Sequence, residues 1–301
     1  MYRSAYLAPD GFTDELLNEL QDDTVEVYEH LVLSTKPAQP AIWADNIWLN
    51  PQAIKIESIG DAAQKLKAIQ RNWANYAFDF YRRSSLITEK LPHVSAKPIK
   101  FPSALPTSPL GSWALLAQDT LLASPSCSSP YPNGAFIFEE DKTAPSRAYL
   151  KLWETLMRLQ KFPKTGETCL DLGASPGGWT WVLQKLGANV ISVDKAPLDP
   201  MIEKLPGVSY KSVSAFALEP AEVGPIDWLF SDIICYPERA LRLIENWKKS
   251  GLVKNIVSTI KFQGETDHET VKKLLEIPSS SAVHLYNNKH EITWFCLEGD
   301  T

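Results

Sequence analysis

The segment Cys169–Trp179, with the sequence CLDLGASPGGW, constrains the fold of this chain more than any other. An apolar run leads into a turn of small residues, and a helical pattern follows. Gly173, Gly177 and Gly178 allow a backbone to approach a ligand with no Cβ in the way, and the start of the helix offers free N–H groups to an anion. The segment therefore predicts a buried strand, a ligand-binding turn and a helix of an α/β sheet.

Strand-like and helix-like segments alternate from Ser146 onward. An amphipathic helix is expected over 146–160 with Ser146 as its N-cap, and further helices over 179–187 and 237–249. The alternation is typical of a doubly wound, Rossmann-like α/β sheet, and the last two strands are close enough to form an antiparallel hairpin at its edge. The strands are expected at 168–173, 189–194, 208–213, 226–232, 255–261, 282–287 and 291–297.

The part of the chain before Ser146 has a different pattern. Prolines recur between Pro92 and Pro132, which excludes a long helix there. Strands are expected at 5–9, 25–34 and 41–49, and helices at 11–20 and 62–83. The expected division is a small α+β domain over 1–95, a proline-rich linker with short strands over 96–140, and the Rossmann-like domain over 141–301.

Composition and charge narrow the class of protein. The 301 residues are 44% hydrophobic and 22% charged, as in globular proteins that bury a core. The net charge of −6 argues against a protein that holds nucleic acid by bulk electrostatic attraction, and leaves room for a local basic groove. The chain shows neither a membrane-spanning run nor a signal peptide, so we expect a cytoplasmic location and no membrane partner. The four cysteines lie far apart and predict neither a metal site nor a disulfide framework.

The turn after the strand at 168–173 has the features of a nucleoside-cofactor site. Asp194 ends the next strand, where a carboxylate can accept hydrogen bonds from ribose hydroxyls. The dinucleotide pattern GxGxxG is absent, whereas the pattern DxGxxPGG that begins at Asp171 resembles motif I of methyltransferases that use S-adenosylmethionine. We therefore expect S-adenosyl-L-methionine as the cofactor. The residues expected to bind it are Ser146, Asp171, Gly173, Ser175, Pro176, Gly177, Gly178, Trp179, Asp194, Ser214 and Asp232.

Two lysines and two carboxylates stand at the ends of expected elements. Lys151 lies on the helix before the first strand, Asp232 and Lys261 each end a strand, and Glu291 begins the last strand. Neighbouring strands of such a sheet bring these ends to one edge, where ligands bind. We therefore expect the four side chains to gather in one catalytic pocket.

These residues also occur in the order of a known family. Five segments resemble the ordered motifs of the FtsJ-type ribose 2′-O-methyltransferases, namely SRAYLKL, DLGASPGGWT, SDI, STIK and HEIT. The resemblance implies RNA as the substrate and a catalytic tetrad of Lys151, Asp232, Lys261 and Glu291, with Lys261 as the proton acceptor. The GGWT form of the loop, the long N-terminal extension and the stretch FPSAL are most similar to a branch that methylates large-subunit ribosomal RNA.

The chemistry of a ribose 2′-hydroxyl explains the use of such a tetrad. This hydroxyl is a poor acid, so its attack on a sulfonium methyl group needs a nearby base and close alignment of the reacting atoms. A lysine can be that base only when neutral, a form that burial and a second cation favour and that carboxylates oppose. Two other interpretations stay open: a methyltransferase that acts on a non-ribose substrate, and a non-catalytic RNA-binding or assembly protein that keeps the fold.

The sequence departs from the branch that it resembles at three positions. Ser175 stands where the branch has cysteine, and Ser214 stands where it has an acidic residue near the adenine. The residues FQGE follow Lys261 where the branch has an LPM-like turn. The branch also carries an RNA-binding array for which residues 1–140 are short and acidic. The expected domain over 1–95 is still a candidate for RNA docking. We therefore expect the adenine contacts and the RNA contacts to differ in detail.

Overall fold

The computed structural model of this chain describes residues 2–95 and 97–299. The chain divides into two compact units, Met1–Phe138 and Glu139–Thr301. The candidate catalytic residues all belong to the second unit.

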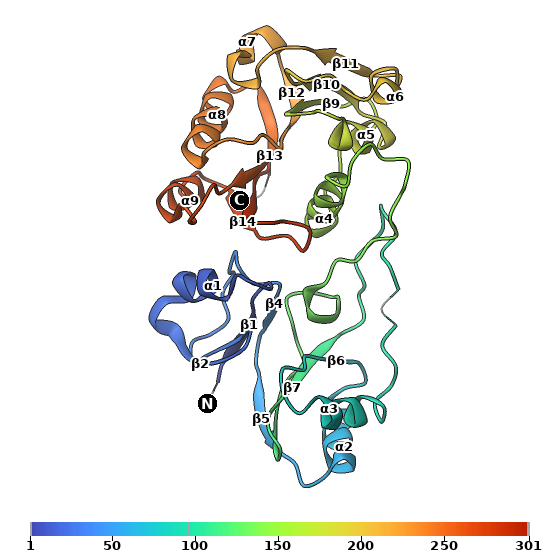
Figure 1. The fold of residues 1–301 in the computed structure, drawn as a ribbon, viewed down its shortest axis with the longest axis vertical. Helices are drawn as coiled ribbons and strands as arrows, with labels where there is room; N and C mark the ends of the chain where they lie inside the picture. The colour runs from blue at the N-terminus through green and yellow to red at the C-terminus, as the bar shows by residue number, and fades with distance from the viewer. Residues whose placement is uncertain (1, 96, 300–301) are drawn as a thin grey trace. The chain divides into compact units, whose positions relative to one another are not determined.

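The second unit is built on one seven-stranded sheet (Figure 1). Its strands are β9 (Thr168–Leu172), β10 (Asn189–Val193), β11 (Val208–Lys211), β12 (Ile226–Ser231), β13 (Val253–Lys261), β14 (Ser280–Val283) and β15 (Glu291–Cys296). Their order in the sheet is β11-β10-β9-β12-β13-β15-β14. The first five strands of this order pair in parallel, while β15 pairs antiparallel with both β13 and β14. The expected doubly wound sheet with an antiparallel hairpin at its edge is confirmed.

Helices cover both faces of this sheet. They are α4 (Tyr149–Leu159), α5 (Gly178–Lys185), α6 (Pro200–Glu203), α7 (Pro220–Val223), α8 (Pro237–Ser250) and α9 (His268–Leu275), with a 3₁₀ turn at Ala215–Ala217. Figure 1 shows α4 and α5 on one side of the sheet and α8 and α9 on the other. The central strands are buried almost throughout because both faces are covered. The strand ends are therefore the places where polar side chains reach a surface.

The helix α4 begins later than its sequence suggests. Its N-cap is Ala148, and no side chain caps it, so Ser146 does not have the N-cap role that the pattern predicted. The aromatic rings of Tyr149 and Trp153 instead pack against Trp181 of α5, with ring centroids 5.4 Å and 6.1 Å away. Tertiary packing of this apolar stripe fixes the helix without the capping hydrogen bond.

The first unit contains two four-stranded sheets. One has the order β2-β3-β1-β4, from β1 (Ser4–Leu7), β2 (Thr24–Tyr28), β3 (Leu31–Ser34) and β4 (Asn46–Trp48). The other has the order β5-β8-β7-β6, from β5 (Gln52–Lys55), β6 (Trp73–Asn75), β7 (Gly111–Ala117) and β8 (Thr120–Ser124). The helices are α1 (Thr13–Leu20), α2 (Ile59–Ile69) and α3 (Tyr81–Thr88), with 3₁₀ turns at Gln21–Asp23 and Pro132–Gly134.

The structure differs from the expected linker over 96–140. The strands β7 and β8 of this stretch lie in the middle of the second sheet and are buried on both faces. Trp113 and Leu115 of β7 pack in the cluster beneath α2 and α3, whereas Ala114 between them packs in the cluster with β1 and β3. This alternation has the period of two that a strand requires. The stretch therefore belongs to the first unit, which ends at Phe138.

The helix expected over 62–83 is also wrong. The structure replaces it with α2, the short strand β6 and α3. Trp73 of β6 pairs in parallel with Gly111 of β7, and its indole Nε1 donates to the carbonyl oxygens of Leu66 and Gln70. Pairing with a distant strand outweighs the local helical pattern here.

Candidate active site

The four predicted catalytic residues meet at one edge of the second unit's sheet. Asp232 directly follows β12, Lys261 is the last residue of β13, and Glu291 is the first residue of β15. Lys261 and Glu291 are cross-strand partners in the antiparallel β13–β15 ladder, which holds their Cβ atoms close together. Lys151 approaches from the first turn of α4.

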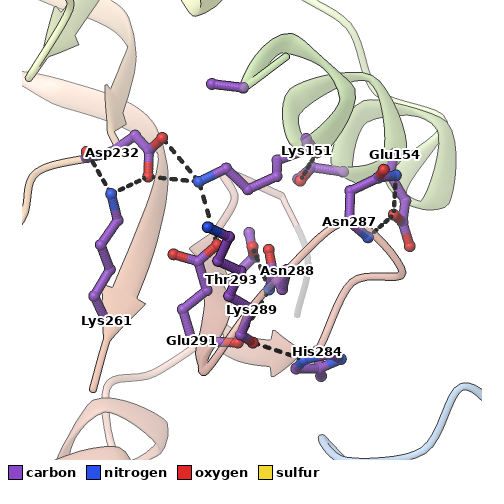
Figure 2. A network of polar contacts seen from close by, with 12 residues as sticks. Lys151, Glu154, Asp232, Lys261, His284, Asn287, Asn288, Lys289, Glu291 and Thr293 are labelled. Carbon is purple, nitrogen blue, oxygen red and sulfur yellow. Dashed lines mark hydrogen bonds and ion pairs between the residues drawn. The ribbon is translucent and has the colours of Figure 1, made fainter. Parts of the chain in front are cut away.

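These four side chains form one chain of contacts (Figure 2). Lys151 Nζ lies 2.9 Å from both carboxylate oxygens of Asp232 and 3.2 Å from Glu291 Oε1. Lys261 Nζ lies 2.9 Å from Asp232 Oδ1 and donates to the backbone carbonyl of Asp232 at 3.0 Å. All four side chains are largely buried, with 9% to 19% of their surface exposed. The juxtaposition that strand-end placement predicted is present.

The two lysines have different surroundings. Burial is the largest single influence on Lys151 and lowers its pKa, but the Asp232 and Glu291 carboxylates together raise it by more, so its pKa lies above the ordinary 10.5. Lys151 is therefore a fixed cation near neutral pH. Lys261 contacts one carboxylate rather than two, and it lines the adjacent cavity. Lys261 is thus the amine that a substrate can reach.

A cavity of about 450 Å³ lies at the carboxyl ends of the parallel strands, and we refer to it as the strand-end cavity. It is lined by Gly173, Ser175, Val193, Asp194, Lys195, Ser214, Ala215, Phe216, Asp232, Ile233, Ile234, Arg239 and Lys261. This volume is in the range of small-molecule sites. The lining combines a carboxylate at the end of β10 with the predicted catalytic residues at the ends of β12 and β13. The cavity therefore fits a nucleoside cofactor that presents its reacting group to Lys261.

Asp194 is held in place for hydrogen bonding at the floor of the strand-end cavity. Its Oδ2 accepts from the backbone N–H of Ser175 at 3.1 Å, and its Oδ1 accepts from the backbone N–H of Ala196 at 2.9 Å. Each carboxylate oxygen retains a lone pair for another donor. This arrangement suits the two hydroxyls of a ribose.

The glycines of the turn are required by its backbone. Gly177, the N-cap of α5, has a φ of 116°, a value that other residues rarely adopt. A Cβ on Gly178 would lie 2.6 Å from Ser146 Oγ. That hydroxyl oxygen is buried and has no hydrogen-bond partner among the residues that the structure describes. An unpartnered hydroxyl at the start of a helix suits an anionic group such as the carboxylate of S-adenosylmethionine.

Several residues predicted to bind the cofactor do not line the strand-end cavity. Asp171 is buried, accepts a hydrogen bond from Thr180 Oγ1 at 2.6 Å, and has a pKa that burial raises to about 7. Trp179 is 3% exposed and donates from its indole Nε1 to the carbonyl of Ala148. These two buried residues support the backbone of the turn and the start of α5 through their hydrogen bonds. The others that do not line the cavity are Ser146, Pro176, Gly177 and Gly178.

Sequence reasoning missed Glu154, one turn after Lys151 on α4. Its side chain is fully buried, pairs with Arg158 at 2.8 Å, and accepts hydrogen bonds from the backbone N–H groups of Tyr286 and Asn287 (Figure 2). It therefore joins the helix that carries Lys151 to the loop that leads to Glu291. A carboxylate in an apolar helix stripe was the available signal.

Phe216 and Arg239 were also missed. Both line the strand-end cavity, and the Arg239 guanidinium lies 3.7 Å from the centre of the Phe216 ring. Arg239 belongs to the first turn of the helix after Asp232, and that position was a usable signal. A single phenylalanine or a single arginine is not a recognisable sequence motif.

Within the described residues, no group of three or more histidine, cysteine or acidic side chains could hold a metal ion. No helix of the described part is both long and apolar enough to cross a membrane.

Comparison with known proteins gives a family match over the second unit. The model of the FtsJ-like methyltransferase family matches residues 144–286. The ribosomal RNA large subunit methyltransferase M of Halorhodospira halophila is 34% identical over 171 residues, which cover 54% of this chain and 50% of that protein. The protein of the same name from Xanthomonas oryzae pv. oryzae is 30% identical over 254 residues, which cover 79% of this chain and 70% of that protein.

Solved structures are more distant. Aeropyrum pernix fibrillarin in complex with natively bound S-adenosyl-L-methionine is 16% identical over 45% of this chain and 67% of its own, with a TM-score of 0.33. A likeness this distant supports no conclusion about this chain.

Proposed function

This chain belongs to the FtsJ-like methyltransferase family, in the group of ribosomal RNA large subunit methyltransferase M, and from that premise we propose that it transfers a methyl group to a ribose 2′-hydroxyl of large-subunit ribosomal RNA. Its cofactor is S-adenosyl-L-methionine. The observation that carries the proposal is the contact chain of Lys261, Asp232, Lys151 and Glu291 beside the strand-end cavity.

The residues of this contact chain have different chemical roles. When bound, S-adenosylmethionine supplies an electrophilic methyl group. Lys261 Nζ accepts the proton of the ribose 2′-hydroxyl, because it faces the strand-end cavity and contacts one carboxylate oxygen. Lys151 stays protonated between Asp232 and Glu291 and offsets part of the charge of these two carboxylates. Asp232 orients both amines through its Oδ1 and Oδ2 atoms.

Substitution Asp194→Ala is expected to weaken the binding of S-adenosylmethionine by about 1–3 kcal/mol, because the ribose hydroxyls lose their acceptor and become buried without a partner. Isothermal titration calorimetry measures this change. The variant Asp199→Ala is a matched control, since Asp199 does not line the strand-end cavity. Parental affinity in Asp194→Ala would refute the assignment of Asp194 to the ribose.

The proposal for the substrate is tested in cells. Ribosomal RNA from cells with and without this protein is digested, and its ribose methylations are mapped by mass spectrometry. We expect the loss of one 2′-O-methyl group from the large-subunit RNA. Identical maps from the two kinds of cell would refute ribosomal RNA as the substrate.

We also propose that the first unit docks RNA at a second cavity. This cavity of about 480 Å³ is lined in part by Lys97, Lys100 and Tyr131. Both lysines are exposed, and neither has an ion-pair partner within the described residues. Two free cations beside an aromatic ring suit a short stretch of unpaired RNA. Docking by so few charges is consistent with the acidic net charge of the chain.

The docking proposal predicts the salt dependence of RNA binding. The double variant Lys97→Ala/Lys100→Ala is expected to reduce the slope of log affinity against log salt by about 1.4, which corresponds to two single-strand phosphate contacts. Fluorescence anisotropy with a labelled RNA fragment measures the slope. Lys67→Ala/Lys90→Ala is the control, because those exposed lysines lie in the same unit but outside the cavity. Equal slopes for the two double variants would argue against docking at this cavity.

A further inference from the structure

Arg239 is a cation of the strand-end cavity to which the reaction described above gives no role. It lies in the first turn of α8, seven residues after Asp232, and its side chain is exposed. Its guanidinium stacks over the Phe216 ring at 3.7 Å. Stacking of this kind restrains the plane of the guanidinium and leaves its N–H edge available to an oxygen ligand.

The two carboxylates of the strand-end cavity and Lys261 already have hydrogen-bond or ion-pair partners. Asp232 contacts Lys151 and Lys261, and Asp194 accepts from two backbone N–H groups. The side chain of Arg239, by contrast, has neither an ion pair nor a hydrogen bond within the part of the chain that the structure describes. An arginine that no carboxylate neutralises, facing a binding cavity, favours an anionic ligand.

Arg239 also lies close to the proton acceptor. The buried Cys235 thiol has a pKa that burial raises, and the charges of Arg239 and Lys261 both act on it in the opposite direction. The two cations therefore both lie near Cys235, in the loop after β12. Lys195 is the remaining cation of the cavity, but no ring or hydrogen bond among the described residues orients it.

We propose that Arg239 binds a phosphate of the RNA backbone next to the target ribose. The inference rests on the proposed function. A ribose 2′-oxygen and its 3′-phosphate are attached to adjacent carbons of one ring, so a hydroxyl delivered to Lys261 brings a phosphate into the same cavity. A guanidinium can hold two phosphate oxygens at once through parallel N–H donors. Arg239 then positions the substrate, and Lys261 accepts the proton.

The test compares Arg239→Met with Arg242→Met in the full chain. Arg242 is an exposed arginine three residues further along α8 that does not line the strand-end cavity, so the two variants lose the same charge from the same helix. The substrate is an unmodified transcript of large-subunit ribosomal RNA. The measurements are kcat/KM at several salt concentrations and the Kd of S-adenosylmethionine by calorimetry.

We expect Arg239→Met to lower kcat/KM for RNA by about 10- to 100-fold, through a higher KM, and to reduce its log–log salt slope by about 0.7. The Kd of S-adenosylmethionine is expected to remain within about twofold of the parental value, and Arg239→Lys to restore the salt slope while recovering part of kcat/KM. Arg242→Met is expected to keep the parental kcat/KM.

If the parent chain methylates RNA, either of two results would overturn this inference. One is an equal salt slope for Arg239→Met and Arg242→Met. The other is a weaker Kd for S-adenosylmethionine with an unchanged KM for RNA, which would assign Arg239 to the cofactor. A parent chain that methylates no RNA would instead refute the proposed function, and this inference with it.

Discussion

Substitution Lys261→Arg is expected to lower the single-turnover rate of RNA methylation by about 10²–10⁴-fold, while S-adenosylmethionine still binds. Arginine keeps the positive charge and the contact with Asp232, but it cannot lose a proton in the working range of pH. Quench-flow measurement of methyl transfer tests the rate.

The control for this substitution lies on the same strand. Lys254→Arg makes the same change on β13 at an exposed lysine that pairs with Asp227 and does not line the strand-end cavity. It is expected to keep the parental rate. A second variant, Lys151→Ala, is expected to reduce the rate less than Lys261→Arg, through lost positioning of the carboxylates. A near-parental rate in Lys261→Arg would contradict a proton-accepting role and leave Lys261 as a charge that steers the ribose.

Substitution Glu154→Gln is expected to lower the free energy of unfolding of the second unit by about 3–5 kcal/mol, the typical cost of removing one partner from a buried ion pair. Glu154 is fully buried, and Arg158 and two backbone N–H groups converge on its carboxylate. The side-chain amide of a glutamine would place N–H donors opposite these N–H groups and the Arg158 guanidinium, which are donors themselves. Hydrogen exchange of backbone amides in β13 and β15 measures the change in this unit alone.

The matched control for Glu154 is an exposed ion pair of the same spacing. Glu269 pairs with Lys273 at 2.7 Å on α9, and its side chain is 80% exposed. Glu269→Gln is expected to leave the stability nearly unchanged, because water screens such pairs. Equal protection of the amides in the two variants would show that Glu154 does not join α4 to the loop before Glu291.

The clustering of the candidate catalytic residues could be predicted from the sequence because strand ends follow simple rules. Asp232, Lys261 and Glu291 stand at boundaries between apolar runs and polar residues, and a parallel sheet gathers such boundaries at one edge. The family resemblance that their order indicated is confirmed by the match over residues 144–286 and by the curated relatives. The contacts of Lys151 depend on how α4 packs, which local sequence does not determine.

The cofactor turn shows what a sequence motif does not determine. A motif identifies the residues that shape a turn, but it does not separate those that face a ligand from those that support the backbone. Asp171 and Trp179 belong to the motif and support it from beneath, whereas Arg239 lies outside the motif and faces the strand-end cavity. Burial and hydrogen bonding in the folded chain make this distinction.

The first unit was harder to predict because its strands are short and pair with distant segments. Trp73–Asn75 lies within a helical pattern, yet it pairs with a strand that begins at Gly111. The prolines between β6 and β7 suggested a linker, although the strands β7 and β8 that follow carry an alternating apolar pattern of their own. Pairing over such separations depends on the whole unit rather than on local propensity.

The central claim is that the methyl group goes to a ribose oxygen, and the position of a labelled methyl group tests it most directly. The purified chain is incubated with an unmodified large-subunit ribosomal RNA transcript and S-adenosylmethionine that carries a deuterated methyl group. The RNA is then digested to nucleosides, and mass spectrometry of their fragments separates sugar from base. Our account predicts that the label is found on the ribose and is lost in Lys261→Arg. A label on a base, or a ribose label that persists in Lys261→Arg, would contradict it.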